Sequence, residues 1–289
     1  RHNNQIIKTD LKLPEWGFKL PIPNHEQLPL NKYQLSHGKN KPLTSVLTSY
    51  GCPHKCSFCV SGRIQYRYRD PENILEEIKY LLKIGVKEIT FRDNIFGFHR
   101  KTAMKLLNGI IENKLKFSWV SDSRVDILDE EMIKLMSEAG CHALHFGIET
   151  NSTETLAAYD KNLRKIDYVQ NTINLCKKYN ILTVGYFILG LPGENLRDVY
   201  NTINYSINLN CDYASFNLPM PIIGTELREK SIEQGLLSDG DETYDGSSEP
   251  IINNKNISSK ELVQLQKKAY RKFYLRFNFI IDKIINIRT

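Results

Sequence analysis

Short runs rich in β-branched and aromatic residues alternate with segments of helical period along most of the chain. The runs predict six strands, at residues 43–49, 88–91, 116–121, 143–148, 182–189 and 212–218. Helix signals lie between them: Asp70 and Pro71 offer an N-cap and a first-turn proline, and Ile74 and Ile78 then share one face until Gly85. The pattern therefore predicts β–α units in series.

The later segments repeat this alternation. Their apolar residues recur at helical spacing in four further stretches: Met104, Leu107 and Ile111; Met132, Ile133 and Met136; Val169, Ile173 and Cys176; Val199, Ile203 and Ile207. A short sixth helix is expected at residues 226–234. Six units in series favour parallel strands with right-handed crossovers. Because a closed barrel needs eight units, we expect an α/β fold with an open, partial (β/α)6 TIM-type barrel.

The two ends of the chain differ from this core. Residues 1–42 carry five prolines and no sustained helical period, which indicates an extended lead-in that wraps a neighbouring segment. Residues 238–248 are acidic and contain glycine, as in a surface loop, and Ser258 with Glu261 forms a capping box for a long C-terminal helix. We therefore expect three parts: a lead-in over 1–42, the core over 43–237, and a loop with a helix over 238–289. The start at Arg1 instead of Met indicates a fragment or a processed chain.

Composition narrows the protein class. The 289 residues are 41% hydrophobic, enough for a sizeable core, and the net charge of +6 permits an anionic partner without requiring one. No apolar run approaches the roughly 20 residues that span a bilayer, and no basic-then-apolar leader is present. Three of the six cysteines lie within eight residues and the other three are scattered. This arrangement does not resemble a disulfide framework in a chain of this size. These features predict a reduced, cytoplasmic protein with one thiolate cluster.

The strongest chemical signal is the run Cys52-x-x-x-Cys56-x-x-Cys59, directly after the first predicted strand. Three thiolates at this spacing can ligate three irons of a four-iron, four-sulfur cluster and leave the fourth iron open to chemistry. The alternative is a zinc site with His54 as its fourth ligand. No second Cys or His pair follows at a zinc-finger distance, so we favour the cluster.

This run, placed after the first strand of a six-fold β/α series, resembles the radical S-adenosylmethionine (SAM) superfamily. The resemblance extends over about residues 21–237. It implies an enzyme whose open iron is chelated by the amino and carboxylate groups of SAM. One electron then cleaves SAM to methionine and a 5′-deoxyadenosyl radical, which abstracts hydrogen from the substrate. A flavodoxin or ferredoxin as electron donor, and a small molecule or natural-product intermediate as substrate, are the partners implied.

Further positions match motifs of the superfamily. By this resemblance, Phe58 packs near the adenine, and Asp93 with Asn94 lies in an F-x-D-D-x-F segment that meets the methionine amino group. Asn94 replaces the second acid of that segment and so lacks its charge. Ser121 and Arg124 end the third strand and are further candidate SAM contacts, although Arg124 could instead pair with Asp126 or Glu149.

The later strand ends carry more of the resemblance. Glu149, in a Gly-Ile-Glu-Thr run similar to G-I-E-S, is expected at the ribose hydroxyls. Lys161 or Arg164 is the expected partner of the methionine carboxylate. Ile188 and Gly190, in the run I-x-G-L-P-G-E, are expected where the backbone approaches the adenine ring.

One branch of the superfamily carries an N-terminal cobalamin-binding domain, and several features resemble it. They are the run I-x-G-L-P-G-E, the sixth-strand ending P-x-P-x-x-G-T, and a proline-rich linker at residues 20–33. The motif D-x-H-x-x-G of that domain does not occur in the sequence, so cobalamin is implied only through a domain outside this chain. Some relatives, including tRNA methylthiolating and haem-pathway enzymes, share the core without cobalamin.

We therefore expect a radical SAM enzyme, of methyltransferase or oxidoreductase type, that carries out cobalamin-linked C-methylation of an unknown substrate. Cyclisation, rearrangement or methylthiolation without cobalamin is the alternative, and a non-catalytic iron–sulfur or zinc module is the alternative of another class. No residue that quenches or relays the radical is assigned. Packing is the favoured role for Cys141, Cys176, Cys211, His142 and His145, although one of the two histidines could line the cavity. The run at residues 62–69, which interleaves basic and aromatic residues, could bind nucleic acid, but we do not expect nucleic acid as the partner.

Overall fold

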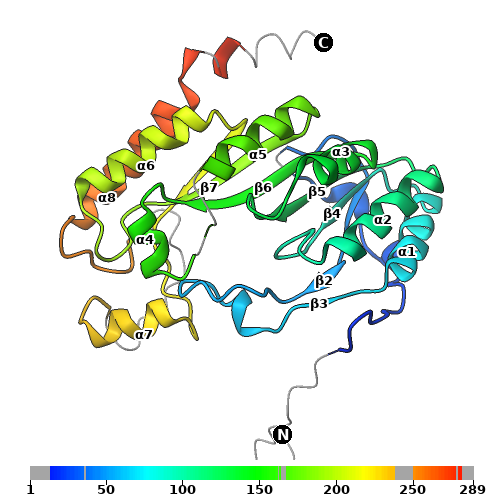
Figure 1. Ribbon diagram of the computed structural model, residues 1–289, viewed down its shortest axis with the longest axis horizontal. Helices are drawn as coiled ribbons and strands as arrows, with labels where there is room; N and C mark the ends of the chain where they lie inside the picture. The colour runs from blue at the N-terminus through cyan, green and yellow to red at the C-terminus, as the bar shows by residue number, and fades with distance from the viewer. Residues whose placement is uncertain are drawn as a thin grey trace, which may run out of the picture.

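The computed structural model describes residues 14–35, 37–161, 163, 167–237, 250–277 and 279–281. Six parallel strands form one sheet in the order β1-β4-β5-β6-β7-β8, and its two outer strands do not pair with each other. The strands are β1 (Leu43–Val46), β4 (Glu88–Phe91), β5 (Ser118–Ser123), β6 (Cys141–Glu149), β7 (Leu182–Ile188) and β8 (Tyr213–Asn217). The predicted α/β fold with an open, partial barrel is confirmed (Figure 1).

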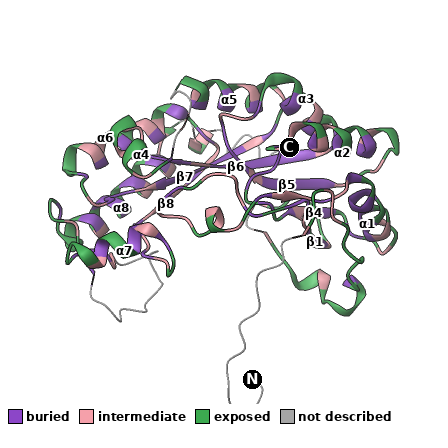
Figure 2. Ribbon diagram, turned by 60° about the horizontal axis from the view of Figure 1, so that its bottom comes forward, coloured by how far each residue is buried: buried purple, intermediate pink, exposed green. Residues whose placement is uncertain are grey.

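Five helices cover the outer face of this sheet, each between two strands. They are α1 (Pro71–Lys83), α2 (Arg100–Glu112), α3 (Glu130–Glu138), α5 (Asp167–Lys178) and α6 (Leu196–Leu209). Their starts follow from local chemistry, because the side chain of Asp70 accepts a hydrogen bond from the amide of Glu72, and Pro71 needs no partner. Outward side chains such as Phe91 and Trp119 pack with these helices in one core, so that the strands are mostly buried and the helices exposed on their far side (Figure 2).

The C-terminal helix α8 (Ser259–Tyr274) covers the open edge of β8. Gln266 Nε2 donates to the carbonyl of Phe216 at 2.9 Å, and Tyr270 Oη accepts from the Phe216 amide at 3.2 Å. Tyr274 Oη accepts from the Ala214 amide at 3.1 Å and donates to the Ala214 carbonyl at 2.7 Å. Side chains of α8 thus take the place of a seventh strand, which protects an edge that would otherwise offer unpaired backbone groups.

The described part of the predicted lead-in, residues 14–35 and 37–42, contacts the core. Two 3-10 turns, η1 (His25–Gln27) and η2 (Leu30–Lys32), carry it past β1, and the buried His25 bonds to Thr44 and to Glu77 of α1. Farther on, Glu88 Oε2 accepts from the amides of Lys39 and Asn40 at 2.7 and 2.5 Å. The segment before β1 is therefore tied to both α1 and the beginning of β4.

The sequence did not predict several short elements. A hairpin of two-residue strands, β2 (Ser49–Tyr50) and β3 (Arg67–Tyr68), encloses the cysteine run together with the 3-10 turn η3 (Ser61–Arg63), and α4 (Thr153–Ala158) follows β6. The helix α7 (Glu226–Glu233) was predicted within one residue. The strand predicted at 116–121 instead ends at Ser123, because Asp122 and Ser123 continue the pairing with β6.

Two of the sequence predictions are not tested by the structure. The acidic loop predicted at residues 238–248 and the candidate Arg164 lie outside the described residues. None of the described helices combines the length and apolar character that crossing a membrane requires.

Candidate functional site

The cysteine run follows β2 through a sharp turn that neighbouring residues fix. Gly51 has a φ of +72°, and a Cβ there would lie 2.3 Å from the carbonyl oxygen of Ile64, so only glycine fits. The amide of Cys52 then bonds to that same carbonyl, at 3.2 Å. Farther along, Ser57 donates its amide to Tyr159 and accepts from the amide of Leu227. The run is thus held from three sides. We call residues 52–59 the thiol loop.

All three thiols of this loop line one cavity of about 510 Å³, which we call the inner cavity. Burial raises the pKa of the Cys52 and Cys56 thiols, while the charges of Arg124 and Lys161 lower it. Both cations line the same cavity. They favour the thiolate form, which is the form that ligates a metal.

The donor set fits the predicted cluster. Within the described residues, no three His, Cys, Asp or Glu side chains converge closely enough to hold a single metal ion. The three thiols line one cavity of about 510 Å³, which suits a cluster with three thiolate corners. His54 lines the same cavity, and burial, followed by the charge of Arg124, lowers its pKa to about 4.

Two buried ion pairs hold three other predicted residues that line the inner cavity, Arg124, Glu149 and Lys161. Lys161 Nζ lies 2.8 Å from Glu149 Oε1, and each side chain is 9% exposed. A Cβ at Gly147 would lie 2.5 Å from that carboxylate oxygen, so the glycine of the G-I-E run leaves room for the pair. Arg124 binds Asp126 in a two-point contact at 2.9 and 2.8 Å, which is one of the two structural pairings considered from the sequence.

Phe58 joins the inner cavity to an apolar neighbour. A second cavity of about 560 Å³ shares Phe58, Cys59 and Glu149 with the first and is otherwise lined mainly by apolar residues, among them Ile188 and Leu218. A flat, largely apolar group of a ligand could therefore lie against Phe58 and Ile188 while its polar groups reach Glu149. Their predicted roles toward SAM agree with this arrangement and stay predictions.

Asp93 and its neighbour Asn94 have different positions. Asn94 lines the inner cavity, donates to the carbonyl of Gly51 and accepts from Ser61. Asp93 does not line it: its Oδ1 accepts from the amides of Thr48 and Ser49 at 2.8 Å, and the Thr48 hydroxyl donates to its Oδ2. Burial raises the pKa of Asp93 to about 6 against these bonds. The structure thus gives Asp93 the task of fixing the chain before the thiol loop.

Two other predicted residues also face away from both cavities. The Ser121 hydroxyl is buried and donates to the carbonyl of Phe91. Gly190 has a φ of +82°, and the space where its Cβ would stand is filled by Leu262 of α8, 2.3 Å away. Its amide donates to Glu194 Oε2 at 2.9 Å. The close approach that this glycine permits is therefore to a helix of the same chain.

Sequence reasoning assigned no site role to several residues that line the inner cavity, among them Arg92, Asp122 and Tyr186. His145, favoured as a core histidine with the cavity as the alternative, lines it as well. His145 Nδ1 lies 3.1 Å from Asp122 Oδ1 and 3.1 Å from the hydroxyl of Tyr186. The available signal was strand alternation, because Asp122, His145 and Tyr186 share the inward face of β5, β6 and β7.

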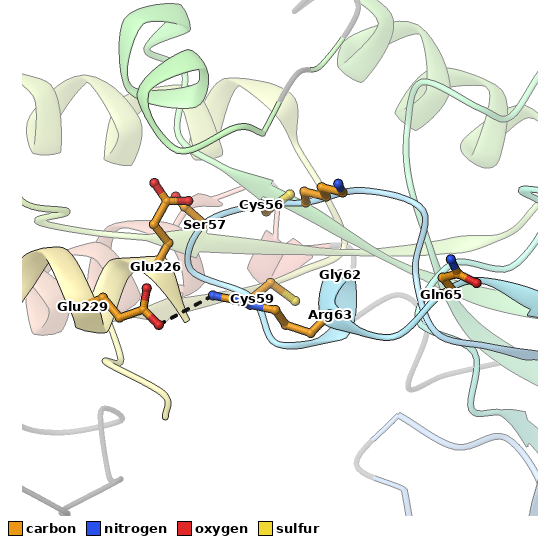
Figure 3. A pocket seen from close by; sticks show the side chains of 9 residues that line it. Cys56, Ser57, Cys59, Gly62, Arg63, Gln65, Glu226 and Glu229 are labelled. Atoms are coloured by element: carbon orange, nitrogen blue, oxygen red, sulfur yellow. Dashed lines mark ion pairs between the residues drawn. The ribbon is translucent and has the colours of Figure 1, made fainter. Parts of the chain in front are cut away.

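The thiol loop also has an outer side. A third cavity of about 580 Å³ is lined by Cys56, Cys59 and polar residues of η3 and α7 (Figure 3). Arg63 and Glu229 form an exposed ion pair of 3.9 Å across it. Two of the three thiols are therefore reached from both sides of the loop.

Comparison with known proteins gives the family. The sequence profile of the radical SAM superfamily matches residues 46–205, more than half of the chain. An uncharacterized methyltransferase of Pyrococcus horikoshii is 34% identical over 92% of this chain, and a bacteriochlorophyllide d C-12(1)-methyltransferase of Chlorobaculum tepidum is 24% identical over 91%. The chain spans 58% and 57% of the length of these two relatives.

Solved structures show the same fold at low sequence identity. The radical SAM methyltransferase TsrM of Kitasatospora setae, with cobalamin and a [4Fe-4S] cluster bound, superposes with a TM-score of 0.63 over 77% of this chain and 46% of that one, at 21% identity. The coproporphyrinogen III oxidase HemN of Escherichia coli gives 0.56 over 81% of this chain and 52% of that one, at 12% identity. Its fold, its thiol loop and these matches together establish that the chain belongs to the radical SAM superfamily.

Proposed function

We propose that this chain is the radical-generating core of a longer enzyme that transfers a methyl group from SAM to a carbon atom of its substrate by way of cobalamin. Superfamily membership implies a four-iron, four-sulfur cluster and SAM as cofactors. When bound, they supply an electron and a 5′-deoxyadenosyl radical. The observation that carries the proposal is the convergence of Cys52, Cys56 and Cys59 on one cavity that Glu149 and Lys161 also line.

The residues divide the binding task. The three thiols would hold the cluster, and the buried pair of Glu149 and Lys161 offers both a carboxylate and an ammonium group to the hydroxyl and carboxylate groups of SAM. Phe58 and Ile188 would receive the adenine on the apolar side.

Methyl transfer is supported by the names of the relatives. The Pyrococcus relative, 34% identical, is a methyltransferase, as is the Chlorobaculum one. Cobalamin is supported by the fold shared with cobalamin-bound TsrM and would be held by a part of the protein outside this chain.

The setting that we propose is the cytoplasm. All six cysteines of the described chain are free thiols, which a reducing compartment maintains. A flavodoxin or ferredoxin there would deliver the electron. The third cavity, which Cys56 and Cys59 line beside α7, would be the place where such a donor approaches the loop.

The proposed function is tested with the full-length protein, reconstituted anaerobically with iron, sulfide and cobalamin and reduced in the presence of methyl-labelled SAM. We expect both 5′-deoxyadenosine and S-adenosylhomocysteine in the mixture. We also expect a substrate product that is heavier by one methyl group and that carries the label. Formation of 5′-deoxyadenosine without S-adenosylhomocysteine would eliminate methyl transfer and leave cyclisation, rearrangement or methylthiolation. Stoichiometric zinc in place of a brown iron chromophore would instead support the non-catalytic module.

A further inference from the structure

Inward side chains of the barrel are polar where they face the inner cavity. Asp122 of β5 lies beside His145 of β6, and Tyr186 of β7 lies beside Gly147, one inward position farther along β6. Closed (β/α)8 barrels fill this layer with branched apolar residues. Polar groups placed there are costly unless they find partners, so a polar atom that the protein leaves unbonded in this layer points to a polar ligand. We call Arg92, Asp122, His145 and Tyr186 the polar wall.

His145 is fixed through both of its ring nitrogens. Its Nδ1 lies 3.1 Å from both Asp122 and Tyr186, and its Nε2 lies 2.7 Å from Nε2 of His37 in the lead-in. An ionised carboxylate only accepts hydrogen bonds, so Nδ1 carries the proton and His37 donates to Nε2. Asp122 remains 39% exposed to the cavity, with only one of its oxygens bonded in the described part of the chain. Asp122, His145 and Tyr186 are thus held in place before any ligand binds.

Arg92 gives this wall a positive charge. It follows β4, is exposed, lines the inner cavity and forms no ion pair or side-chain hydrogen bond with any described residue. Burial and the charge of Asp122 raise the pKa of Tyr186, and the charge of Arg92 lowers it. Arg124 and Lys161, the other cations of the cavity, are already paired with Asp126 and Glu149. A planar guanidinium is suited to two-point binding of a carboxylate or a phosphate.

We propose that the polar wall is a substrate subsite for a small organic anion, which binds Arg92 through its carboxylate or phosphate and the Asp122–His145–Tyr186 group through a second polar atom. This assignment of substrate class rests on the proposed function, because the subsite adjoins the thiols and the Glu149–Lys161 pair in one cavity. The ligand thereby completes the hydrogen bonds that the wall leaves open.

The test measures binding of small probes to the full-length, cluster-loaded protein saturated with SAM. Benzoate, phenyl phosphate and the neutral benzamide have similar shapes, and calorimetry gives their dissociation constants. We expect one of the two anions to bind about tenfold or more tighter than benzamide, the range that a charge-assisted hydrogen bond supports. The anion that binds more tightly then shows whether the polar wall recognises a carboxylate or a phosphate. Equal binding of all three probes would overturn the proposal.

Variants separate this subsite from the SAM site. Arg92→Gln should remove the preference for the anion, Arg92→Lys should retain part of it, and the exposed control Arg197→Gln should leave it unchanged. The dissociation constant of SAM should shift by less than about threefold in Arg92→Gln. If that variant instead weakens SAM binding tenfold and keeps the anion preference, Arg92 belongs to the SAM site and the proposal is wrong. Formation of 5′-deoxyadenosine by the parent protein reports separately on the proposed function.

Discussion

The thiol loop and the polar wall line the same cavity, and the chain encodes them differently. The loop places three cysteines within eight consecutive residues, whereas the wall takes single residues from the ends or middles of four strands. A loop carries its ligands wherever it folds, but the wall exists only in the correct strand register, because a shift by one residue would turn its side chains to the outer face. The comparison suggests that cofactor binding can be found from a motif and substrate binding only from the fold.

The largest expected effect lies in the thiol loop. Replacing Cys52, Cys56 or Cys59 singly by Ala should remove the cluster almost completely, because two thiolates cannot hold three of its irons. Iron and sulfide analysis with the visible absorption spectrum of anaerobic protein measures the loss. Cys211→Ala, a change in the buried core, serves as the control and should keep its iron. A cluster that survives in any of the three loop variants would contradict the assignment.

The elements around the thiol loop show which parts of the fold could be predicted from the sequence and which could not. Strand 88–91 and the start of α1 agree with their predicted positions, because apolar alternation and the Asp70–Pro71 cap are local signals. The hairpin of β2 and β3 and the helix α4 were missed, because two-residue strands and a six-residue helix leave too short a pattern. They are nevertheless the elements that surround the thiol loop.

The second effect concerns the ion pair that faces the loop. Lys161→Met leaves the buried Glu149 carboxylate without its partner and should lower the free energy of unfolding by about 4 kcal/mol. The double variant Glu149→Gln with Lys161→Met should regain most of that stability, because no unpaired charge remains. Urea unfolding under anaerobic conditions measures both.

SAM binding separates a role in ligand binding from a purely structural one. We expect the double variant to bind SAM at least about tenfold more weakly than the parent, even though its stability is restored. If the double variant binds SAM like the parent, the pair is structural and the residues carried over from the superfamily are wrong at these two positions.

The third effect concerns Glu194, whose carboxylate accepts from the amides of Gly190 and Leu191. Burial, and to a smaller extent the charge of Asp198, raises its pKa from 4.5 to about 7. The folded state therefore holds this proton more tightly than the unfolded chain. The stabilisation that protonated Glu194 gives the folded state is complete below about pH 4.5 and is lost as the pH rises through about 7.

Glu194→Gln removes this titration while its amide oxygen can still accept both hydrogen bonds. Between pH 5 and 8, the fall in the free energy of unfolding should be smaller in the variant, by at most about 3 kcal/mol. Urea unfolding across this range measures the slope. The exposed Glu112→Gln serves as the control, and a slope equal to that of the parent in Glu194→Gln would contradict this origin of the pH dependence.

Glu194 and Gly190 also show what could not be predicted from the motif alone. The run I-x-G-L-P-G-E was interpreted through what a ligand would need, yet in the structure its glycine accommodates Leu262 of α8, and its glutamate bonds to the backbone of its own turn. Asp93 was interpreted in the same way, and it fixes Thr48 and Ser49. A motif states which residue types recur together; only packing states which of them face a cavity and which hold the others in place.

The smallest effect tests the link between the lead-in and the polar wall. His37 bonds to His145 at 2.7 Å and stacks on Tyr213 with ring centres 5.7 Å apart. His37→Ala should cost about 1 kcal/mol of stability, the usual contribution of one hydrogen bond, and leave iron content unchanged.

The same variant should also weaken binding of the preferred anionic probe, by about threefold, because His145 loses the donor that fixes its ring. His37→Gln, which can still donate to His145 Nε2, should restore the binding without restoring the stacking. Calorimetry on both variants decides between two roles of the lead-in. If His37→Ala loses stability but binds the probe like the parent, the lead-in only holds the barrel together, and the wall is positioned by its strands alone. If His37→Gln recovers the binding, a segment outside the barrel contributes to substrate recognition, because its donor to Nε2 orients His145 together with the contacts of Nδ1.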